Sequence, residues 1–354
     1  MIKIREAAER DNEVLIELQK RCPQGTNFVL GIDSSPDFFA RSRPFRDWHV
    51  FVAIKDASIV GSAACAISPT YVEGKQFKTA YEYGFTVDPH HRRKGIAEKL
   101  QEYMERIARD KNVDLLHLDI TEDNIPSINL FSKMGFKKVK DCATFSLIAY
   151  REQGISREAN IRKMVKSDVG RVANLINEMY EDCDFFTPFK ARDFIEYIER
   201  MPHFDFNNIL VFEDDKVIKA CLGYWDYNKV RKYIVQKFNW KSKAQVFSMR
   251  LMRLFAKMPN IPTQGQPLLS YNLATLAYKD PSSITELIKH VINLALENKI
   301  DFLHIPLDPE SQAAVLLSQF RHTKVKLHFF IKSLKQKDIP NLGKRKLYID
   351  ISEI

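Results

Sequence analysis

Hydrophobic and polar positions divide the first 150 residues into short strands and amphipathic helices. Apolar runs of strand length cover 50–54, 59–61, 83–87 and 115–120. Between the last two, apolar residues take a helical spacing over 96–104, and a second helix is expected up to Lys20. Asp11 and Asn124 stand where Asp and Asn commonly cap helices. Strands and helices of these lengths in alternation predict an α/β fold.

The order of elements in the first 150 residues recurs later in the chain. At an offset of 157, residues 161–168 repeat the pattern of residues 4–11. Three further segments match in the same order: 209–218 with 50–61, 277–281 with 85–89, and 300–305 with 113–118. Ordered internal matches indicate a duplicated unit. We therefore predict one unit over 1–150, a polar linker over 151–159, and a second unit over 160–354.

The second unit differs from the first in two places. Its Asp280-Pro281 pair leads directly into Ser282, with no arginine-rich turn and no glycine, so we expect this unit to lack a phosphate site. It also carries an insertion over 229–258 whose apolar positions have helical spacing and whose outer face is basic. A basic amphipathic helix can lie on membranes or bind nucleic acid. Packing of the helix on its own domain needs fewer assumptions, and we favour it.

Length and cysteine content limit the class of protein. A chain of 354 residues is long enough for two domains, and no apolar run approaches the roughly 18 residues of a membrane span. The N-terminal residues enter a structured pattern without the apolar region of a signal peptide. The five cysteines are scattered, without a Cys-x-x-Cys, which argues against a disulfide framework or a zinc site. These features indicate a cytoplasmic protein without a membrane partner.

The net charge of +9 is concentrated in the second unit. Residues 1–150 hold 22 Lys+Arg against 21 Asp+Glu, and the remaining residues hold 32 against 24. From Tyr227 to Lys279 there are ten basic residues and no acidic one. Such asymmetry can mark an acidic partner, so 229–279 is the segment through which a nucleic acid would bind. We favour the simpler reading of solvated helix faces and expect no nucleic-acid partner.

Residues 92–97 carry the most specific chemistry. They follow the apolar run 83–87 and an Asp-Pro pair, and they lead into the predicted helix. Backbone N–H groups at a helix start lack partners, and the helix dipole and three cationic side chains add positive charge, so the segment suits a pyrophosphate. Neither the P-loop nor the Rossmann glycine pattern is present. The predicted phosphate-binding residues are Arg92, Arg93, Lys94, Gly95, Ile96 and Ala97.

A second motif follows some thirty residues later, after the run 115–120. It reads Asn-x-x-Ser-x-x-Leu-Phe-x-x-x-Gly-Phe, from Asn124 to Phe136. Together with Arg-x-x-Gly-x-Ala at 92–97, it resembles the acetyl-CoA signature of the GNAT N-acetyltransferase family, over roughly residues 3–150. The tandem layout, with segments 21–25 and 36–41, more loosely resembles the plant Hookless-type acetyltransferase-like proteins, which implies no particular substrate.

The GNAT resemblance implies an α/β fold of two units, each a mixed, mostly antiparallel sheet flanked by helices. It implies acetyl-CoA as co-substrate, no metal, and cofactor contacts from Asn124, Ser127 and Phe131. In the family, the strand before the phosphate loop is bulged and splays from its neighbour, so the backbone of Phe85, Thr86 and Val87 would pair with the pantetheine arm. Gly84 fits a close approach of backbone to ligand, although relief of strand crowding would explain it equally.

Acyl transfer to an amine needs a base and, commonly, an acid for the leaving thiolate. The resemblance implies Asp119 or Glu82 as the base, against the alternative that each is simply a solvated strand-end residue. Phe131 stands where the family commonly has a Tyr acid, and a phenyl ring has no donor. Tyr83 or Tyr81 could substitute, or water could, or the thiolate could leave unaided; we take Tyr83 as the candidate.

Histidines offer little further chemistry in this chain. His90 and His91 are adjacent in a loop and have no apparent third ligand, so we predict no metal site. His117 and His304 occupy equivalent predicted strands in the two units. Because the unit without a phosphate loop keeps its histidine, we expect both to have packing roles.

The sequence therefore predicts an acetyl-CoA-dependent N-acetyltransferase acting by direct attack of a primary amine in a ternary complex. The acceptor is a small-molecule or peptide amine, its pocket drawing on residues 27–46, and nothing indicates the oligomeric state. One alternative is a catalytically weak or inactive GNAT-like binding protein whose basic second unit docks a protein or nucleic-acid partner. Another is an acetyltransferase of a protein-borne or nucleic-acid-borne amine that uses the same unit for docking.

Overall fold

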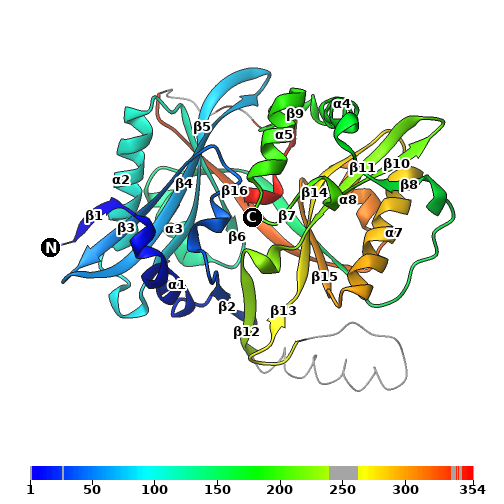
Figure 1. Ribbon diagram of the computed structural model, residues 1–354. Coiled ribbons are helices and arrows are strands. Elements are labelled where there is room, and N and C mark those ends of the chain that lie inside the picture. The colour runs from blue at the N-terminus through cyan, green and yellow to red at the C-terminus, as the bar shows by residue number, and fades with distance from the viewer. Residues whose placement is uncertain are drawn as a thin grey trace.

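The computed structural model describes residues 2–25, 28–238, 262–335, 340, 342 and 345–353. Within these residues, twelve strands form one sheet in the order β1-β3-β4-β5-β6-β16-β7-β15-β14-β11-β10-β8. Helices cover both faces of the sheet, which runs through both halves of the molecule (Figure 1). Neighbouring strands are antiparallel except for β5–β6 and β14–β15. The predicted mixed, mostly antiparallel α/β architecture is therefore confirmed, with both halves joined in one sheet.

The two halves share part of their order of elements, and the second has β12, β13 and β17 in addition. The first half contains β1 (Lys3–Glu6), α1 (Asn12–Lys20), β2 (Phe28–Asp33), η2 (Phe38–Arg41), β3 (Asp47–Lys55), β4 (Ser58–Val72), β5 (Lys75–Val87), η3 (Pro89–His91), α2 (Ile96–Asp110), β6 (Leu115–Thr121), α3 (Ile125–Lys133) and β7 (Lys137–Ile148). The second contains β8 (Ile161–Lys163), α4 (Val169–Tyr180), β9 (Cys183–Asp184), α5 (Ala191–Arg200), β10 (Ile209–Asp214), β11 (Val217–Trp225), η7 (Tyr227–Lys229), β12 (Lys232–Phe238), β13 (Pro267–Leu268), β14 (Ser270–Tyr278), α7 (Pro281–Glu297), β15 (Phe302–Leu307), α8 (Gln312–Leu317), β16 (His322–Ser333), β17 (Lys346–Leu347) and η8 (Ile351–Glu353).

In the first half, α1 packs on one face of the sheet and α2 and α3 pack on the other. Leu15 of α1 shares an apolar cluster with Tyr81 and Tyr83 of β5. Leu100 of α2 packs in a separate cluster, with residues from the opposite faces of β3 and β4. Because side chains alternate along a strand, odd and even positions of β5 enter different environments.

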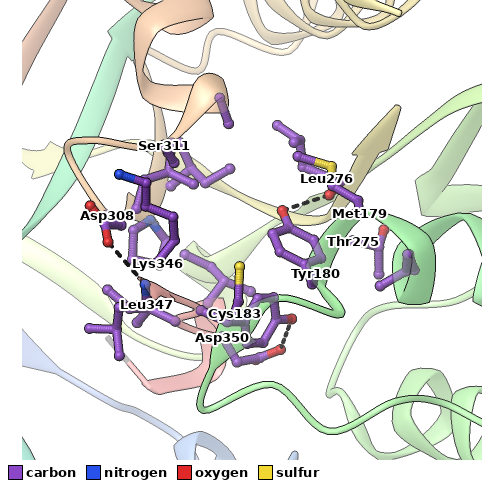
Figure 2. A pocket seen from close by; sticks show the side chains of 18 of the residues that line it. Met179, Tyr180, Cys183, Thr275, Leu276, Asp308, Ser311, Lys346, Leu347 and Asp350 are labelled. Atoms are coloured by element: carbon purple, nitrogen blue, oxygen red, sulfur yellow. Dashed lines mark hydrogen bonds between the residues drawn. The ribbon is translucent and has the colours of Figure 1, made fainter. Parts of the chain in front are cut away.

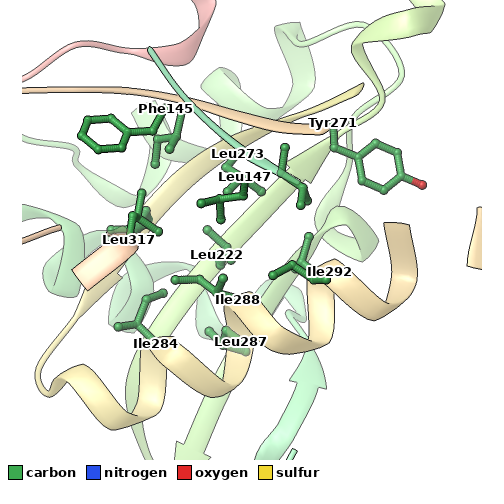
Figure 3. Packing of buried hydrophobic residues seen from close by; sticks show 14 of the residues in the cluster. Phe145, Leu147, Leu222, Tyr271, Leu273, Ile284, Leu287, Ile288, Ile292 and Leu317 are labelled. Atoms are coloured by element: carbon green, nitrogen blue, oxygen red, sulfur yellow. The ribbon is translucent and has the colours of Figure 1, made fainter. Parts of the chain in front are cut away.

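In the second half, α7 provides the apolar face that packs on the sheet (Figure 3). Ile284, Leu287, Ile288, Val291, Ile292 and Ala295 are all buried. Their spacing of three and four residues puts them on one side of the helix, as expected for an amphipathic helix on a sheet. Phe145 and Leu147 of β7 belong to the same cluster and are fully buried. A strand from the first half is therefore part of the second half's core.

In the twelve-stranded sheet, β7 of the first half and β16 of the second each pair with strands of the other half. β16 lies between β6 and β7, pairing Phe329 with Asp119 on one side and with Lys140 on the other. β7 in turn pairs with β15, through Phe145 and Ile305. At the centre of the sheet, β16 of the second half therefore lies between two strands of the first half, and β7 of the first half lies between two strands of the second.

A second contact between the halves corrects the prediction for the insertion 229–258. Lys232–Phe238 is not helical but forms strand β12, which pairs antiparallel with β2 and carries β13 on its other edge. Val235 is fully buried and Tyr233 packs against the second half's core. Pairing with a distant strand overrides the local helical spacing. The rest of the insertion, from residue 239, lies outside the described residues.

Candidate functional site

Strand β5 contains a β-bulge where it pairs with β4 in the first half's part of the sheet. Tyr83 is paired with Ala64 of β4 and Thr86 with Ser62, so two residues of β5 oppose one of β4. Gly84 lies in the bulge with φ of +67°, a conformation that residues with a Cβ rarely adopt. A bulge bends its strand and leaves backbone groups unpaired.

The bulge coincides with the divergence of β5 from β6. The two strands pair in parallel only from Thr79 to Tyr81, opposite Leu115 to His117. Beyond that point β6 continues to pair with β16, while the β6-facing edge of β5 has no strand partner among the described residues. Unsatisfied backbone groups at a sheet edge can take an extended ligand as an additional strand. Phe85, Thr86 and Val87, the predicted pantetheine contacts, lie along this edge.

The N-terminus of α2 stands at the end of the same strand. Gly95 is the N-cap residue, with φ of +72°, and it has no side chain to occupy the first N–H groups of α2. Arg92, Arg93 and Lys94 are exposed, and none forms an ion pair with another described residue. Lys94 Nζ donates to the His90 carbonyl at 2.8 Å, and Arg92 Nε to the Val87 carbonyl at 3.2 Å. The result is an open helix N-terminus with three cationic side chains before it, as an anion site requires, and with one carboxylate, that of Glu98, in its first turn, paired with Lys133 at 3.2 Å.

The corresponding helix of the second half is closed to such a ligand. Asp280 caps α7, and its carboxylate accepts from the Ser283 N–H at 2.9 Å and from the hydroxyls of Ser282 and Ser283 at 2.6 and 2.8 Å. A carboxylate therefore occupies the position that a phosphate would take.

Helix α3 borders the splay on its other side. Asn124 caps this helix, with its Oδ1 accepting from the Ser127 N–H at 3.3 Å. Phe131 is buried and meets Phe85 edge to face, with ring centroids 4.9 Å apart, and also contacts Phe136 at 5.4 Å. The Phe131 ring therefore fills apolar space beside the bulge and offers no proton donor there.

Asp119 lies on β6 just beyond the divergence. Its Oδ1 accepts a weak hydrogen bond from Cys142 Sγ at 3.5 Å, and its Oδ2 is enclosed with no partner among the described residues. Burial raises the pKa of Asp119 to about 7, although the Cys142 contact opposes the shift. An enclosed carboxyl group with a pKa near neutrality is suited to general-base catalysis.

Glu82 points to the opposite face of the sheet. Its Oε1 accepts from Gln101 Nε2 of α2 at 3.0 Å, and its Oε2 is enclosed without a partner among the described residues. Burial raises the pKa of Glu82 to about 8. The structure therefore does not bring Glu82 together with Asp119, and the sheet separates the two candidate bases.

Tyr81 and Tyr83 lie on the same face as Asp119. Their rings stack at 5.1 Å, and Tyr81 contacts His117 of β6 at 5.4 Å. The Tyr83 hydroxyl donates to Ser42 Oγ at 2.8 Å. Burial raises the pKa of Tyr83 above its ordinary value, so its hydroxyl keeps its proton at neutral pH. Tyr83 and Asp119 are thus on a common face, and either tyrosine retains a proton that it could donate.

The histidines are located within packed or bonded surroundings. His117 is 2% exposed among Tyr81, Phe185 and Phe329, and burial lowers its pKa to about 3. His304 bonds Ser146 Oγ through its Nδ1 at 2.8 Å. Among the described residues, no group of three or more His, Cys, Asp or Glu side chains could hold a metal ion.

Several polar residues on the Asp119 face were missed by sequence reasoning. Arg41, Tyr227 and Arg231 are each at most 9% exposed, and Glu353 joins them from the C-terminal segment, which lies between the halves (Figure 1). An arginine inside the apolar run 38–41 was a weak signal for Arg41. Nothing in the sequence indicated that residues 190 positions apart would meet, because pairing of β12 with β2 brings them together.

A separate cavity of about 300 Å³ opens in the second half, where β14 and β15 diverge (Figure 2). The Tyr180 hydroxyl there donates to the Leu276 carbonyl at 2.8 Å. Asp308 is paired with Lys140 at 2.9 Å and accepts from the Leu347 N–H at 2.9 Å. The hydroxyl of Tyr180 and the carboxylate of Asp308 thus already have partners within the protein, whereas the β6-facing edge of β5 has no strand partner among the described residues. No described helix is long and apolar enough to cross a bilayer.

Comparison with known proteins places this geometry in a family. Residues 13–136 match the family model described as "Acetyltransferase (GNAT) family". Over 95 residues, the chain is 37% and 34% identical to N-alpha-acetyltransferases of Saccharolobus solfataricus and Sulfurisphaera tokodaii. Each alignment takes in 25% of this chain and spans 57% of the length of the relative.

The fold as a whole is similar to that of a solved acyltransferase. The structure of Saccharomyces cerevisiae N-myristoyltransferase with bound myristoyl-CoA matches with a TM-score of 0.67 at 13% identity, covering 98% of this chain and 85% of that one. At this identity the likeness concerns the fold alone. Residues 13–136 thus match the GNAT acetyltransferase family model, and both sequence motifs of that family lie on one splayed sheet edge within this part of the chain.

Proposed function

We propose that the first half is an acetyl-CoA-dependent N-acetyltransferase that acts on a primary α-amine. The observation that carries this proposal is the continuity of three features: the open N-terminus of α2, the unpaired edge of β5, and Asp119 beyond the point where β5 leaves β6. Acyl-CoA fits this set, because its pyrophosphate, its extended amide arm and its thioester need an anion site, a backbone edge and a nearby base in that order.

In the proposed mechanism, bound acyl-CoA supplies an activated acyl group. The Asp119 carboxylate removes a proton from the acceptor ammonium, and the free amine attacks the thioester carbonyl. A bond forms between nitrogen and carbon, the carbon–sulfur bond breaks, and the products are an amide and CoA. Tyr83 or Tyr81 is the proposed donor for the thiolate, since both hydroxyls stay protonated. The nitrogen loses its second proton as the amide forms, and this proton restores the tyrosine.

A short acyl group is supported by the packing beside the bulge. Phe131, at 4% exposed, and Phe85 fill the space between β5 and α3. We therefore expect Phe131→Ala to raise the rate with butyryl-CoA or hexanoyl-CoA relative to acetyl-CoA by roughly tenfold, because removal of a buried ring leaves an apolar cavity. Rates with the acyl-CoA series measure this ratio, and wild-type preference for a long chain would contradict the proposal.

The proposed acceptor is a peptide or protein α-amine, because both curated relatives are named N-alpha-acetyltransferases. The test is release of CoA thiol from acetyl-CoA over a panel of free amino acids, polyamines and short peptides, with the product identified by mass. Activity on an α-amine supports the proposal. Acetyl-CoA hydrolysis without any acylated product, or transfer only to side-chain amines, would refute it.

We also propose that 1–150 and 160–354 are two copies of one unit. Two equivalent aspartates support this: Asp11 accepts from the Ala8 N–H and pairs with Arg5 at 2.6 Å, and Asp168 makes the same contacts with the Val165 N–H and Arg162 at 2.6 Å. In this proposal only the first copy binds acyl-CoA, the second contributes β16 to its sheet, and the protein is cytoplasmic.

A further inference from the structure

Arg41 is a buried cation without a carboxylate partner among the described residues. It lies at the end of η2 and is 8% exposed. Its Nη1 donates to the Ser352 carbonyl at a long 3.4 Å, and its Nε has no partner. One face of the guanidinium covers the Tyr83 ring, with Cζ 4.5 Å from the centroid. The Nε–H group therefore lacks an acceptor among the described residues.

Arg231 approaches the same place from the second half. It stands between η7 and β12, is 9% exposed, and its Nε also lacks a partner. The Tyr227 hydroxyl nearby is enclosed and has no partner either. The Arg231 backbone N–H donates to the Tyr227 carbonyl at 2.8 Å, and both arginines act electrostatically on Tyr227 and on Tyr83. Ala40, Tyr227 and Val230 pack in one apolar cluster and hold η2 against η7.

Two buried guanidinium groups are costly in free energy unless an anion meets them, because arginine cannot lose its proton in a protein. Glu353 acts electrostatically on Arg41, but desolvation raises the pKa of Glu353 well above its ordinary value, which disfavours its charged form. The basic stretch from Tyr227 to Lys279 contains no acid. Among the described residues, no ionised carboxylate is paired with either guanidinium group.

Arg41 also lies near Asp119, the proposed catalytic base. The Arg41 guanidinium covers Tyr83, whose ring stacks on Tyr81, and Tyr81 contacts His117, two residues before Asp119 on the same face of β6. We infer that Arg41 and Arg231 bind a carboxylate of the acceptor, positioning its amine at Asp119. Planar guanidinium groups suit this task, because two N–H donors match the two oxygens of a carboxylate.

This inference rests on the proposed function and narrows its substrate class. The acceptor is an amine that carries a carboxylate within a few bonds of its nitrogen. Two sources share that chemistry: a free amino acid, whose α-carboxylate would meet the arginines, and a peptide that begins with Asp or Glu, whose side chain would do so.

The activity test compares carboxylate acceptors with their amides. Free alanine and alaninamide form one arm, which varies the α-carboxylate, and peptides starting with Glu or Gln form the other, so the active arm identifies the source. Wild-type kcat/KM should favour the carboxylate by roughly 10- to 100-fold, the range for a charge-assisted hydrogen bond. Arg41→Gln and Arg231→Gln should each bring that ratio towards one and leave KM for acetyl-CoA unchanged. Arg43→Gln is the control, since Arg43 is exposed and pairs with Asp37 at 2.8 Å.

A binding test separates this inference from the proposed function. Glutarate, which has no amine, should raise the melting temperature of the wild type and of Arg43→Gln but not of either buried-arginine variant. Glutarate binding without any acyl transfer would support the carboxylate site but refute the proposed function. Equal activity on carboxylates and amides, with no glutarate effect, would overturn the inference alone.

The melting temperature of Arg41→Gln provides a third test of the inference. If the guanidinium awaits an external anion, removing its charge should leave the melting temperature of the ligand-free protein equal or higher. A variant that fails to fold, or melts much lower, would show that Arg41 has a partner within the chain and would also overturn the inference.

Discussion

Two carboxyl groups near the splay, Asp119 and Glu82, point to opposite faces of the sheet and have different proposed roles. Asp119 shares its face with Tyr81 and Tyr83, where the acceptor is proposed to bind. Glu82 faces α2 and bonds Gln101. Both pKa values are raised by burial, so a raised pKa alone does not identify the base. The surroundings of each carboxyl group favour Asp119 over Glu82 as the base, and a substitution at each residue tests this assignment.

Asp119→Asn should reduce kcat by roughly 10²-fold or more, with little change in the dissociation constant for acetyl-CoA, because a base acts on the amine. With the pKa of Asp119 at about 7, kcat/KM of the wild type should rise with pH up to about 7 and then level off. The variant should lack this limb. The pH at which kcat/KM levels off should also be the same for acceptors whose amines have different pKa values. An unchanged turnover with weakened acetyl-CoA binding would make Asp119 structural.

Glu82→Gln should stabilise the protein at alkaline pH. The folded-state pKa of about 8 lies above the usual value of 4.5, so the folded state holds a proton that the unfolded state releases between these values. Wild-type stability therefore falls as pH rises through that window, by an amount on the order of a few kcal/mol. Melting temperatures of the variant should match wild type near pH 4 and exceed it at pH 9.

Glu102→Gln provides the control for this comparison, since Glu102 is an exposed residue of α2. Its melting profile should follow that of the wild type across the whole pH range. A Glu82→Gln variant that is less stable at every pH would show that Glu82 is held as a needed charge, and would reopen its assignment as the base.

At the scale of elements, the two halves differ most at the start of one helix. The first N–H groups of α2 follow Gly95 and are open, whereas those of α7 are capped by Asp280. The difference arises from a few residues, because both helices follow an Asp-Pro pair and only the first has an arginine-rich turn before its helix.

Gly95→Asp should weaken acetyl-CoA binding by roughly tenfold or more, because it puts a carboxylate where the pyrophosphate is expected and opposes it electrostatically. Titration calorimetry should give one site per wild-type chain. Gly154→Asp is the matched control, since nothing lies within 4 Å of a Cβ at Gly154. Two equivalent sites in the wild type, or unchanged affinity in Gly95→Asp, would contradict the assignment.

Features set by neighbouring residues could be predicted from the sequence. The cap at Asn124 and the strand break after Val87 depend on local backbone chemistry, and the structure has both. Lys232–Phe238 was expected to be helical and is a strand, because its partner β2 lies some 200 residues earlier. Arg41 and Arg231 could not be paired from the sequence for the same reason: their proximity depends on contacts between distant segments.

At the scale of the whole molecule, the central exchange of β16 and β7 could not be predicted either. Both strands have the apolar alternation of a sheet strand, and alternation does not say which half supplies the neighbour. The consequence for stability is large. Phe329, Phe330 and Ile331 of β16 are at most 2% exposed, and Phe330 belongs to the core formed by β6, α2 and α3.

A fragment of residues 1–150 should therefore fail to fold cooperatively. Each of those three side chains contributes roughly 1.5–3 kcal/mol on burial, which together is comparable with a typical net stability of roughly 5–15 kcal/mol. The fragment would also expose the unpaired edges of β6 and β7. Circular dichroism should show no sharp melting transition, and acetyl-CoA affinity should be lost.

The control for truncation is a full-length chain cut within the linker at an engineered protease site beside Gly154, an exposed position. Because the nicked protein keeps β16 between β6 and β7, it should melt close to the intact chain and bind acetyl-CoA with equal affinity. Adding the separate fragment 160–354 to fragment 1–150 should restore part of that binding. If fragment 1–150 alone melts like the intact chain and is fully active, the exchanged strand is dispensable and the second half is a docking module.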